Sequence, residues 1–172
     1  MDAAQRRREI LEVLKQNEDP VSAGALASQF HVSRQIVVGD IALLRAANEE
    51  IFATPRGYVM NRGTGEGSIV HTIACRHSRE NLAEELYIIV DSGCGLQDVI
   101  VEHPVYGQLS GQLHIFSRLD ADIFLEKLEK DHAVPLSNLT DGVHLHTVLC
   151  RSEQAYEQML QKLREKKILF TK

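Results

Sequence analysis

The spacing of apolar residues in the first 60 positions predicts three helices followed by a β-hairpin. The helices cover about residues 4–16, 22–30 and 33–47, and two short strands, 51–53 and 58–60, flank a four-residue turn. Ser22 and Ser33 stand at the starts of the second and third helices, where a hydroxyl can cap free backbone N–H groups. The apolar positions of the third helix that follow the 3.6-residue period are Ile36, Val37, Ile41, Leu43 and Leu44. Of these, Ile36, Val37, Ile41 and Leu44 are expected to pack inward.

A different order of elements is predicted after residue 68. The expected elements are a strand at 70–76, a helix at 78–91 capped by Ser78, strands at 99–101 and 108–116, a helix at 120–130, a strand at 143–151 and a helix at 153–166. This order is that of a split βαβ sandwich of ferredoxin-like type with one extra helix. The first and last strands of such a sheet can lie close together. The sequence therefore predicts an α+β protein.

A glycine-rich stretch separates the two patterns. Residues 61–68 hold three glycines among polar residues and show no apolar spacing, which is typical of a linker. A chain of 172 residues is long enough for two small domains. We therefore expect a first domain at 1–60 and a second at 69–172, joined by this linker.

Composition narrows the class of protein without identifying it. The chain is 44% hydrophobic and 25% charged, as in ordinary globular proteins. Its apolar runs are too short to span a bilayer and its N-terminus is rich in charge, so we expect no membrane span and a cytoplasmic location. The three cysteines lack metal-type CxxC spacing, and we expect reduced thiols.

The charge distribution gives no general attraction for nucleic acid. The net charge is −5, and residues 1–60 carry seven basic and eight acidic side chains. DNA binding by the first domain therefore depends on the positions of a few arginines. In a helix-turn-helix the second helix enters the major groove, so its first turns need long polar side chains. Ser33, Arg34, Gln35 and Gly39-Asp40 occupy those positions in the predicted third helix.

Individual side chains suit particular DNA contacts. Arg34 can bind guanine or a phosphate, and Gln35 can pair with adenine. Arg56 lies at the tip of the predicted hairpin, where a wing would offer it to the DNA backbone or the minor groove. The DNA-binding candidates are Ser33, Arg34, Gln35, Arg45 and Arg56.

Histidine placement in the second domain indicates a metal site. His144 and His146 are separated by one residue on a predicted strand, so both side chains leave the same face. His77 ends the first strand, which can lie beside the last one. Glu85 borders the apolar face of the next helix, whereas its neighbour Glu84 points towards solvent. Three imidazoles and one carboxylate suit nickel, zinc or iron, and the spacing does not choose among them.

Three further residues are candidates for binding a small ligand beside this metal. Arg76 is adjacent to His77 and can bind an anionic group. His103 lies in the predicted loop 102–107, where it either lines a ligand pocket or caps the turn. Tyr106, in the same loop, can cover the face of a ring.

Longer stretches of the chain resemble known regulators. Residues 30–45, which begin Phe-His-Val-Ser-Arg-Gln, resemble the winged helix-turn-helix of biotin repressors and related bacterial regulators. The whole chain resembles the niacin-responsive repressors, whose C-terminal part is the three-histidine domain. The segments that carry this resemblance are Thr72–His77, His103–Gly107, Pro135–Thr147 and Ala53–Tyr58. By position, the family's metal ligands fall on His77, Glu85, His144 and His146.

The resemblance implies a repressor of niacin uptake and NAD biosynthesis genes, with nicotinic acid as co-repressor. We expect it to act as a homodimer, because a single helix-turn-helix covers little DNA. The alternative regulator is a repressor for which the metal itself is the effector. An enzyme that uses the metal to activate water is not expected, because no Gly-rich nucleotide loop or nucleophile elbow follows the linker.

Overall fold

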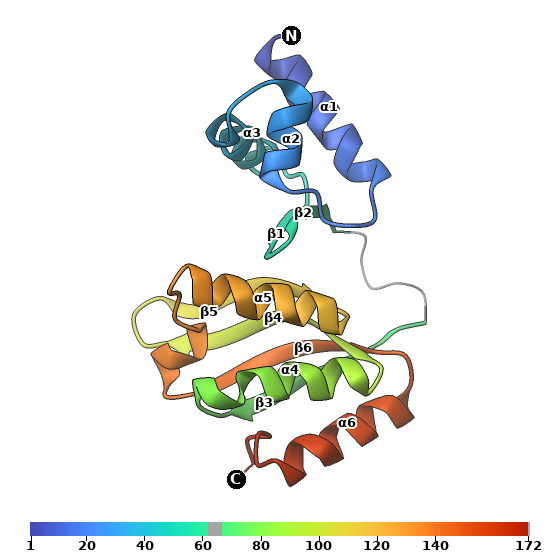
Figure 1. Cartoon of the computed structure of the whole chain (residues 1–172), viewed down its shortest axis with the longest axis vertical. Helices are drawn as coiled ribbons and strands as arrows, with labels where there is room; N and C mark the ends of the chain where they lie inside the picture. The colour runs from blue at the N-terminus through green and yellow to red at the C-terminus, as the bar shows by residue number, and fades with distance from the viewer. Residues whose placement is uncertain (62–66, 172) are drawn as a thin grey trace. The chain divides into compact units, whose positions relative to one another are not determined.

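The computed structural model describes residues 1–61 and 67–171 of the chain (Figure 1). It divides into two compact units, residues 1–63 and 64–172, each of which has its own apolar core. Most of the predicted linker at 61–68 lies outside the described residues.

The first unit contains three helices and a two-stranded sheet, in the order that the sequence predicts. These elements are α1 (Ala3–Gln16), α2 (Ala23–Phe30), α3 (Arg34–Ala46), β1 (Ile51–Thr54) and β2 (Gly57–Met60). The hydroxyls of Ser22 and Ser33 accept hydrogen bonds from the backbone N–H groups of Ala25 and Ile36, so both predicted caps are confirmed.

The buried face of α3 is narrower than the sequence suggests. Val37, Ile41 and Leu44 are buried with Ile10 and Leu14 of α1. Ile36, expected to point inward, is 42% exposed, and Leu43, assigned to the same helical period, is 56% exposed. The helical repeat explains the difference. Residues 37, 41 and 44 already fill the stripe of α3 that faces α1 and α2, and Ile36 and Leu43 each lie about 100° around the helix from a residue of that stripe.

The wing depends on one glycine. Val21, just before α2, exchanges backbone hydrogen bonds with Tyr58 and so adds a short bridge to β2. Gly57, the residue before Tyr58, has a φ of 141°, and a side chain at this position would collide with the backbone of Val21. Only glycine fits this combination of conformation and close approach.

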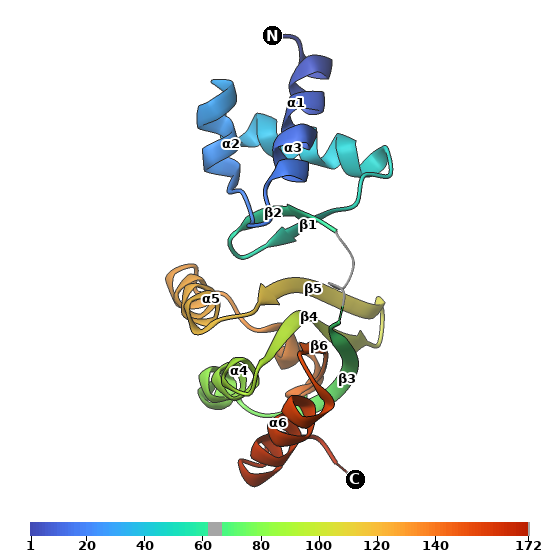
Figure 2. The same cartoon turned by 90° about the vertical axis from the view of Figure 1, so that its right-hand side faces the viewer.

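The second unit consists of one sheet with its helices on one side (Figure 2). Its elements are β3 (Ile69–Arg76), η1 (Arg79–Asn81), α4 (Leu82–Asp91), β4 (Cys94–His103), β5 (Gly107–Ile115), α5 (Arg118–Lys130), η2 (Leu136–Thr140), β6 (Val143–Cys150) and α6 (Glu153–Glu165). Ser78 precedes η1 and makes no side-chain cap, so its predicted role as the cap of a single long helix is wrong.

The sheet has the strand order β3-β6-β4-β5, and all its pairs are antiparallel. β6 lies between β3 and β4, the two strands that α4 connects, which is the split βαβ arrangement. The α+β class is therefore confirmed. The ferredoxin-like prediction needs one refinement, which concerns strand order. The centre of this sheet holds β4 and β6, the second and fourth strands of the unit.

Pairing of the central strands corrects the cysteine prediction. Cys94 at the start of β4 lies opposite Cys150 at the end of β6, and the two form a disulfide, while Cys75 is free and buried. The expectation of three reduced thiols is thus wrong for two of them. Counting cysteines cannot reveal such a pair, because the two residues are 56 positions apart and meet only through strand pairing.

Candidate functional site

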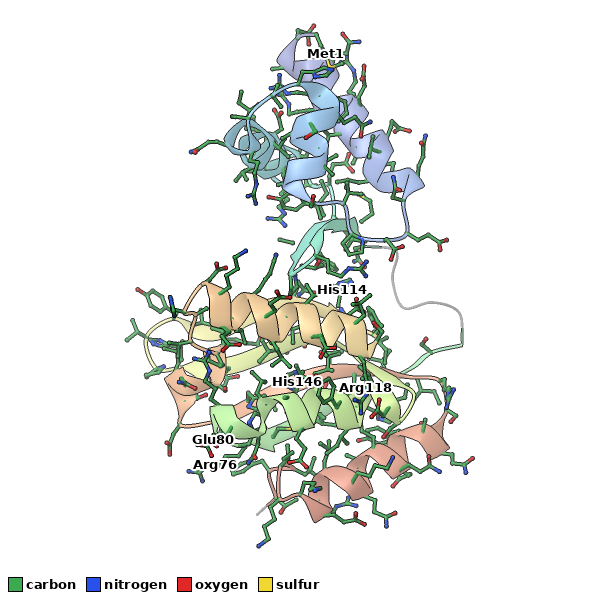
Figure 3. All side chains as sticks on the ribbon, in the orientation of Figure 1. Met1, Arg76, Glu80, His114, Arg118 and His146 are labelled. Carbon is green, nitrogen blue, oxygen red and sulfur yellow. A yellow bond between two sulfur atoms is a disulfide. The ribbon has the colours of Figure 1, made fainter. Side chains whose placement is uncertain are left out.

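Three elements of the second unit bring four of the predicted residues together. His144 and His146 lie on the helix-facing side of β6, His77 follows the end of β3, and Glu85 extends from the first turn of α4. Glu85 is fully buried, whereas Glu84 points outward and pairs with Lys166 at 3.0 Å. The two neighbouring carboxylates thus separate as the helical spacing predicts. Figure 3 shows His146 in the interior of the unit and Arg76 at its edge.

The three imidazoles converge on the Glu85 carboxylate through their Nε2 atoms. His77 Nε2 lies 2.6 Å from Oε2, while His144 Nε2 and His146 Nε2 lie 3.0 and 3.2 Å from Oε1. The rings of neighbouring histidines meet edge to face, with centroids 4.9 and 4.8 Å apart. Convergence of these nitrogens on one acceptor makes this cluster the strongest candidate site in the second unit.

The other ring nitrogen of each histidine faces a backbone carbonyl. Nδ1 of His77, His144 and His146 lies 2.8, 2.8 and 2.7 Å from the carbonyl oxygens of Ser78, Gly142 and Asp98. A carbonyl only accepts, so each Nδ1 carries a proton and donates it. A neutral ring then has its lone pair at Nε2, facing an anionic carboxylate. That arrangement requires a cation at Nε2, either a proton or a metal ion.

Electrostatics in the cluster are dominated by the buried carboxylate. Burial raises the pKa of Glu85, but the charge of His146 and the contacts with all three histidines outweigh it and hold that pKa well below its usual value. Burial lowers the pKa of His77 and of His146, and the contacts with Glu85 more than reverse the effect, so both pKa values are raised. The cluster therefore retains a negative carboxylate that attracts positive charge.

The donor set fits a divalent transition metal. Nδ1–H bonds to carbonyls fix the ring orientations, as the outer-shell partners of metal-bound histidine do. Cys75 joins the cluster as well: its Sγ, an oxygen of Glu85 and a nitrogen of His144 all lie within 4.8 Å of one another. Sequence reasoning missed Cys75. Two features indicate it: Cys75 lies two positions before His77 along the chain, and it lies on a strand that pairs with the strand of His144.

A polar cleft adjoins the cluster. It has a volume of about 570 Å³. Its lining residues are Arg76, His77, Ser78, Arg79, Asn138, Asp141 and Gly142. Arg76 donates to Asp141 over 3.0 Å, and the Arg79 guanidinium donates to the carbonyl of Ala133. His77 thus lines the cleft and also belongs to the buried cluster. Among the pockets that the structure describes, this cleft therefore gives the nearest access to the four residues.

Two predicted ligand contacts lie outside this lining. His103 Nδ1 accepts hydrogen bonds from the backbone N–H groups of Val105 and Tyr106, each over 3.1 Å. This is the turn-capping role that the sequence left open beside the ligand role. Tyr106 is 75% exposed at the tip of the β4–β5 hairpin. The structure therefore brings Arg76 to the cleft, but neither His103 nor Tyr106.

In the first unit α2 and α3 form a helix-turn-helix. His31 links them in the left-handed conformation, with a φ of 54°. Arg34 and Gln35 occupy the first turn of α3 and are exposed, so both are free to reach a DNA groove. The hydroxyl of Ser33 is engaged as the helix cap.

Three other polar residues of this unit have partners within the protein. Asp40, expected among the DNA-reading positions, is buried and paired with Arg6 at 2.6 Å, so that expectation is wrong. Arg45 donates through Nε to the Ile51 carbonyl and lies over the Tyr58 ring. Arg56 is at the wing tip, as expected, 3.8 Å from Asp19.

Comparison with known proteins agrees with both units. Residues 70–172 match the 3H domain family, and residues 6–59 match a helix-turn-helix (HTH) domain. The chain belongs to the 3H domain family. It is 42% identical over 168 residues to the transcription repressor NadR of Bacillus subtilis, spanning 96% of this chain and 93% of that protein. It is 38% identical over 165 residues to the probable transcription repressor NiaR of Thermotoga maritima, spanning 96% and 93%.

Membership of the 3H domain family confirms the resemblance found in the sequence and sets the functional class. The relatives are named as transcription repressors and this chain carries a helix-turn-helix domain, so this 3H protein is a DNA-binding transcription repressor and not an enzyme. Among the residues described, no helix combines the length and apolar character needed to cross a bilayer.

Proposed function

We propose that the protein represses genes of niacin uptake and NAD biosynthesis and that nicotinic acid is its co-repressor. The repressor names NadR and NiaR of its relatives, and their similarity over nearly the whole chain, support this assignment. The observation that carries it is the double role of His77, which belongs to a buried cluster of metal-ligand type and also lines an open cleft.

The proposed metal ligands are His77, Glu85, His144 and His146, and the ion is a divalent nickel, zinc or iron. The support is the geometry of four donors whose orientations are fixed by backbone carbonyls and by α4. A bound divalent ion would supply a Lewis-acidic position beside the cleft. The residues of this chain supply the rest: they fix the ring orientations and keep the donors away from water.

The proposed ligand site is the cleft beside His77. Nicotinic acid presents a carboxylate and a ring nitrogen on a flat ring, and the two arginines of the cleft, Arg76 and Arg79, suit the carboxylate. Asp141 already holds Arg76, so a ligand carboxylate would compete with Asp141 for that guanidinium. Contacts from His103 and Tyr106 remain predictions that lie outside the cleft lining.

We further propose that the protein acts in the cytoplasm as a homodimer. A dimer offers two helix-turn-helix units to two half-sites, which one copy cannot cover. Arg34 and Gln35 would contact base edges, while Ser33, Arg45 and Arg56 would position the unit on the DNA backbone. Ligand bound in the second unit would act by favouring one arrangement of the two DNA-reading units.

The test is calorimetry of nicotinic acid and nicotinamide with metal-loaded and metal-stripped full-length protein. We expect the acid to bind more tightly, because the amide lacks the charge that Arg76 would pair with. Binding should fall in metal-stripped protein. Equal affinities for acid and amide, or undiminished binding after stripping, would contradict the proposal.

The function itself is tested by binding to an operator selected from random duplex DNA. Nicotinic acid should tighten operator binding by the wild type and should do so less for Arg76→Ala. Arg118→Ala is the matched control, because Arg118 is likewise an exposed arginine paired with an aspartate, Asp91. If metal alone gives the full increase and nicotinic acid adds nothing, the protein is a metal-sensing repressor.

A further inference from the structure

Cys75 lies inside the cluster and has no part in the function proposed above. It pairs in register with His144 across β3 and β6, and its side chain is completely buried. Its Sγ is within 4.8 Å of both a Glu85 oxygen and a His144 nitrogen. Cys94 and Cys150 are joined to each other, so Cys75 carries the only free thiol of the three cysteines that the structure describes.

We propose that Cys75 is a further ligand of the metal in this centre, an inference that rests on the proposed metal centre. Bond lengths to zinc are about 2.3 Å for sulfur and about 2.1 Å for nitrogen or oxygen, so two donors on one ion lie at most about 4.4 Å apart. Donors that already lie within 4.8 Å need only small side-chain adjustments to reach that spacing. When the metal–sulfur bond forms, the thiol proton leaves to solvent.

His146 gives a second indication that a cation belongs in the cluster that Cys75 joins. Its Nε2 is buried and lies 3.2 Å from Glu85 Oε1, but it makes no hydrogen bond of good geometry with any residue that the structure describes. Because Nδ1 of His146 already donates to the Asp98 carbonyl, Nε2 is the ring nitrogen left without a hydrogen bond. A buried polar atom in this state is unfavourable unless a ligand binds it. That oxygen of Glu85 also contacts His144, the cross-strand neighbour of Cys75.

A thiolate in the donor set changes which metals the centre prefers. Sulfur is a softer donor than imidazole nitrogen or carboxylate oxygen, so it favours zinc, nickel, cobalt and iron(II) over magnesium or manganese. Cys75 is therefore a determinant of metal selectivity in this chain. The effect of Cys75 on metal selectivity can be measured separately from that of the four ligands that the sequence pattern predicts, because those four remain when Cys75 is replaced.

The test uses the full-length protein, stripped of metal and reloaded with one equivalent of Co²⁺. We expect the wild type to show a near-ultraviolet thiolate-to-cobalt charge-transfer band. Cys75→Ser and Cys75→Val should each lose this band, still bind cobalt through the remaining donors, and bind it at least about tenfold more weakly. Cys94→Ser/Cys150→Ser is the matched control, which should keep the band.

A wild type that binds one equivalent of cobalt without the band would overturn the inference and leave the proposed metal centre intact. Retention of the band in both Cys75 variants would overturn it as well. Failure of the wild type to bind cobalt at all would remove the metal centre and the inference together. If both variants unfold, X-ray absorption of the zinc-loaded wild type decides, because a sulfur ligand gives a scatterer at about 2.3 Å and its absence there contradicts the proposal.

Discussion

The guanidinium of Arg6 donates through Nε to Oδ2 of Asp40 over 2.6 Å, and this contact joins α1 to the middle of α3. Arg7 approaches the other carboxylate oxygen at 3.5 Å. Asp40 is buried on the inner face of α3, opposite the face that carries Gln35. The pair therefore joins α3 to α1 and holds the Asp40 carboxylate inside the unit, away from the exposed face of α3.

Asp40→Asn should destabilise the first unit, because Arg6 then loses its anionic partner in a half-buried position. Urea denaturation of the full-length protein, followed by a probe in the first unit, should give a lower midpoint than the wild type. Arg7→Ala should lower that midpoint less, since its contact is longer. Equal midpoints for wild type and Asp40→Asn would show that the pair contributes nothing to stability.

Arg34→Ala or Gln35→Ala should weaken operator binding by about 1–3 kcal/mol, because each removes a base contact from the first turn of α3. Gel-shift titrations should show the loss for the operator but little change for unrelated duplexes. Arg56→Ala should instead weaken all duplexes alike, since a wing tip mostly holds phosphate. Arg164→Ala on α6 is the control; operator affinities of wild-type level for both α3 variants would mean that another face reads the DNA.

His144→Ala/His146→Ala should abolish metal binding, because it removes two of the converging Nε2 donors. Elemental analysis of the purified variant should find no bound metal where the wild type retains a full equivalent. His71→Ala/His103→Ala, which removes the same number of imidazoles from outside the cluster, should retain it. A full equivalent bound by the first double variant contradicts the ligand assignment.

Metal binding and metal-free stability should change with pH in opposite directions. The raised pKa values of His77 and His146 mean that protons hold Nε2 up to a higher pH than the usual value of about 6.5, so metal affinity should fall as the pH drops through those values. In metal-free protein the paired imidazolium ions stabilise the fold below the unfolded pKa, and this stability is lost as the pH rises through the folded pKa.

Glu85 does not disturb this window, because its pKa is lowered: its contribution is present above the unfolded pKa and is lost only as the pH falls through the folded one. Denaturation of stripped and loaded protein between about pH 6 and 9 measures both trends. Parallel pH profiles for the two forms would contradict the proposed competition between protons and metal.

Local periodicity was sufficient for the elements and for part of the site. Alternation on a strand places His144 and His146 on one face, and the helical repeat separates Glu85 from Glu84. Both results depend only on the geometry of the element that carries the residues. The same is true of the Ser22 and Ser33 caps, whose partners lie three residues away.

Tertiary structure decided the features that join distant segments. The Cys94–Cys150 disulfide, the Arg6–Asp40 pair and the approach of Cys75 to His144 each depend on which strands or helices become neighbours. Sequence spacing does not encode these neighbours, because strand order and helix packing result from burying all the apolar faces together. The exposure of Ile36 has the same cause. Its hydrophobicity is a property of the residue itself, but whether its side chain is buried depends on how wide a stripe of α3 the neighbouring helices cover.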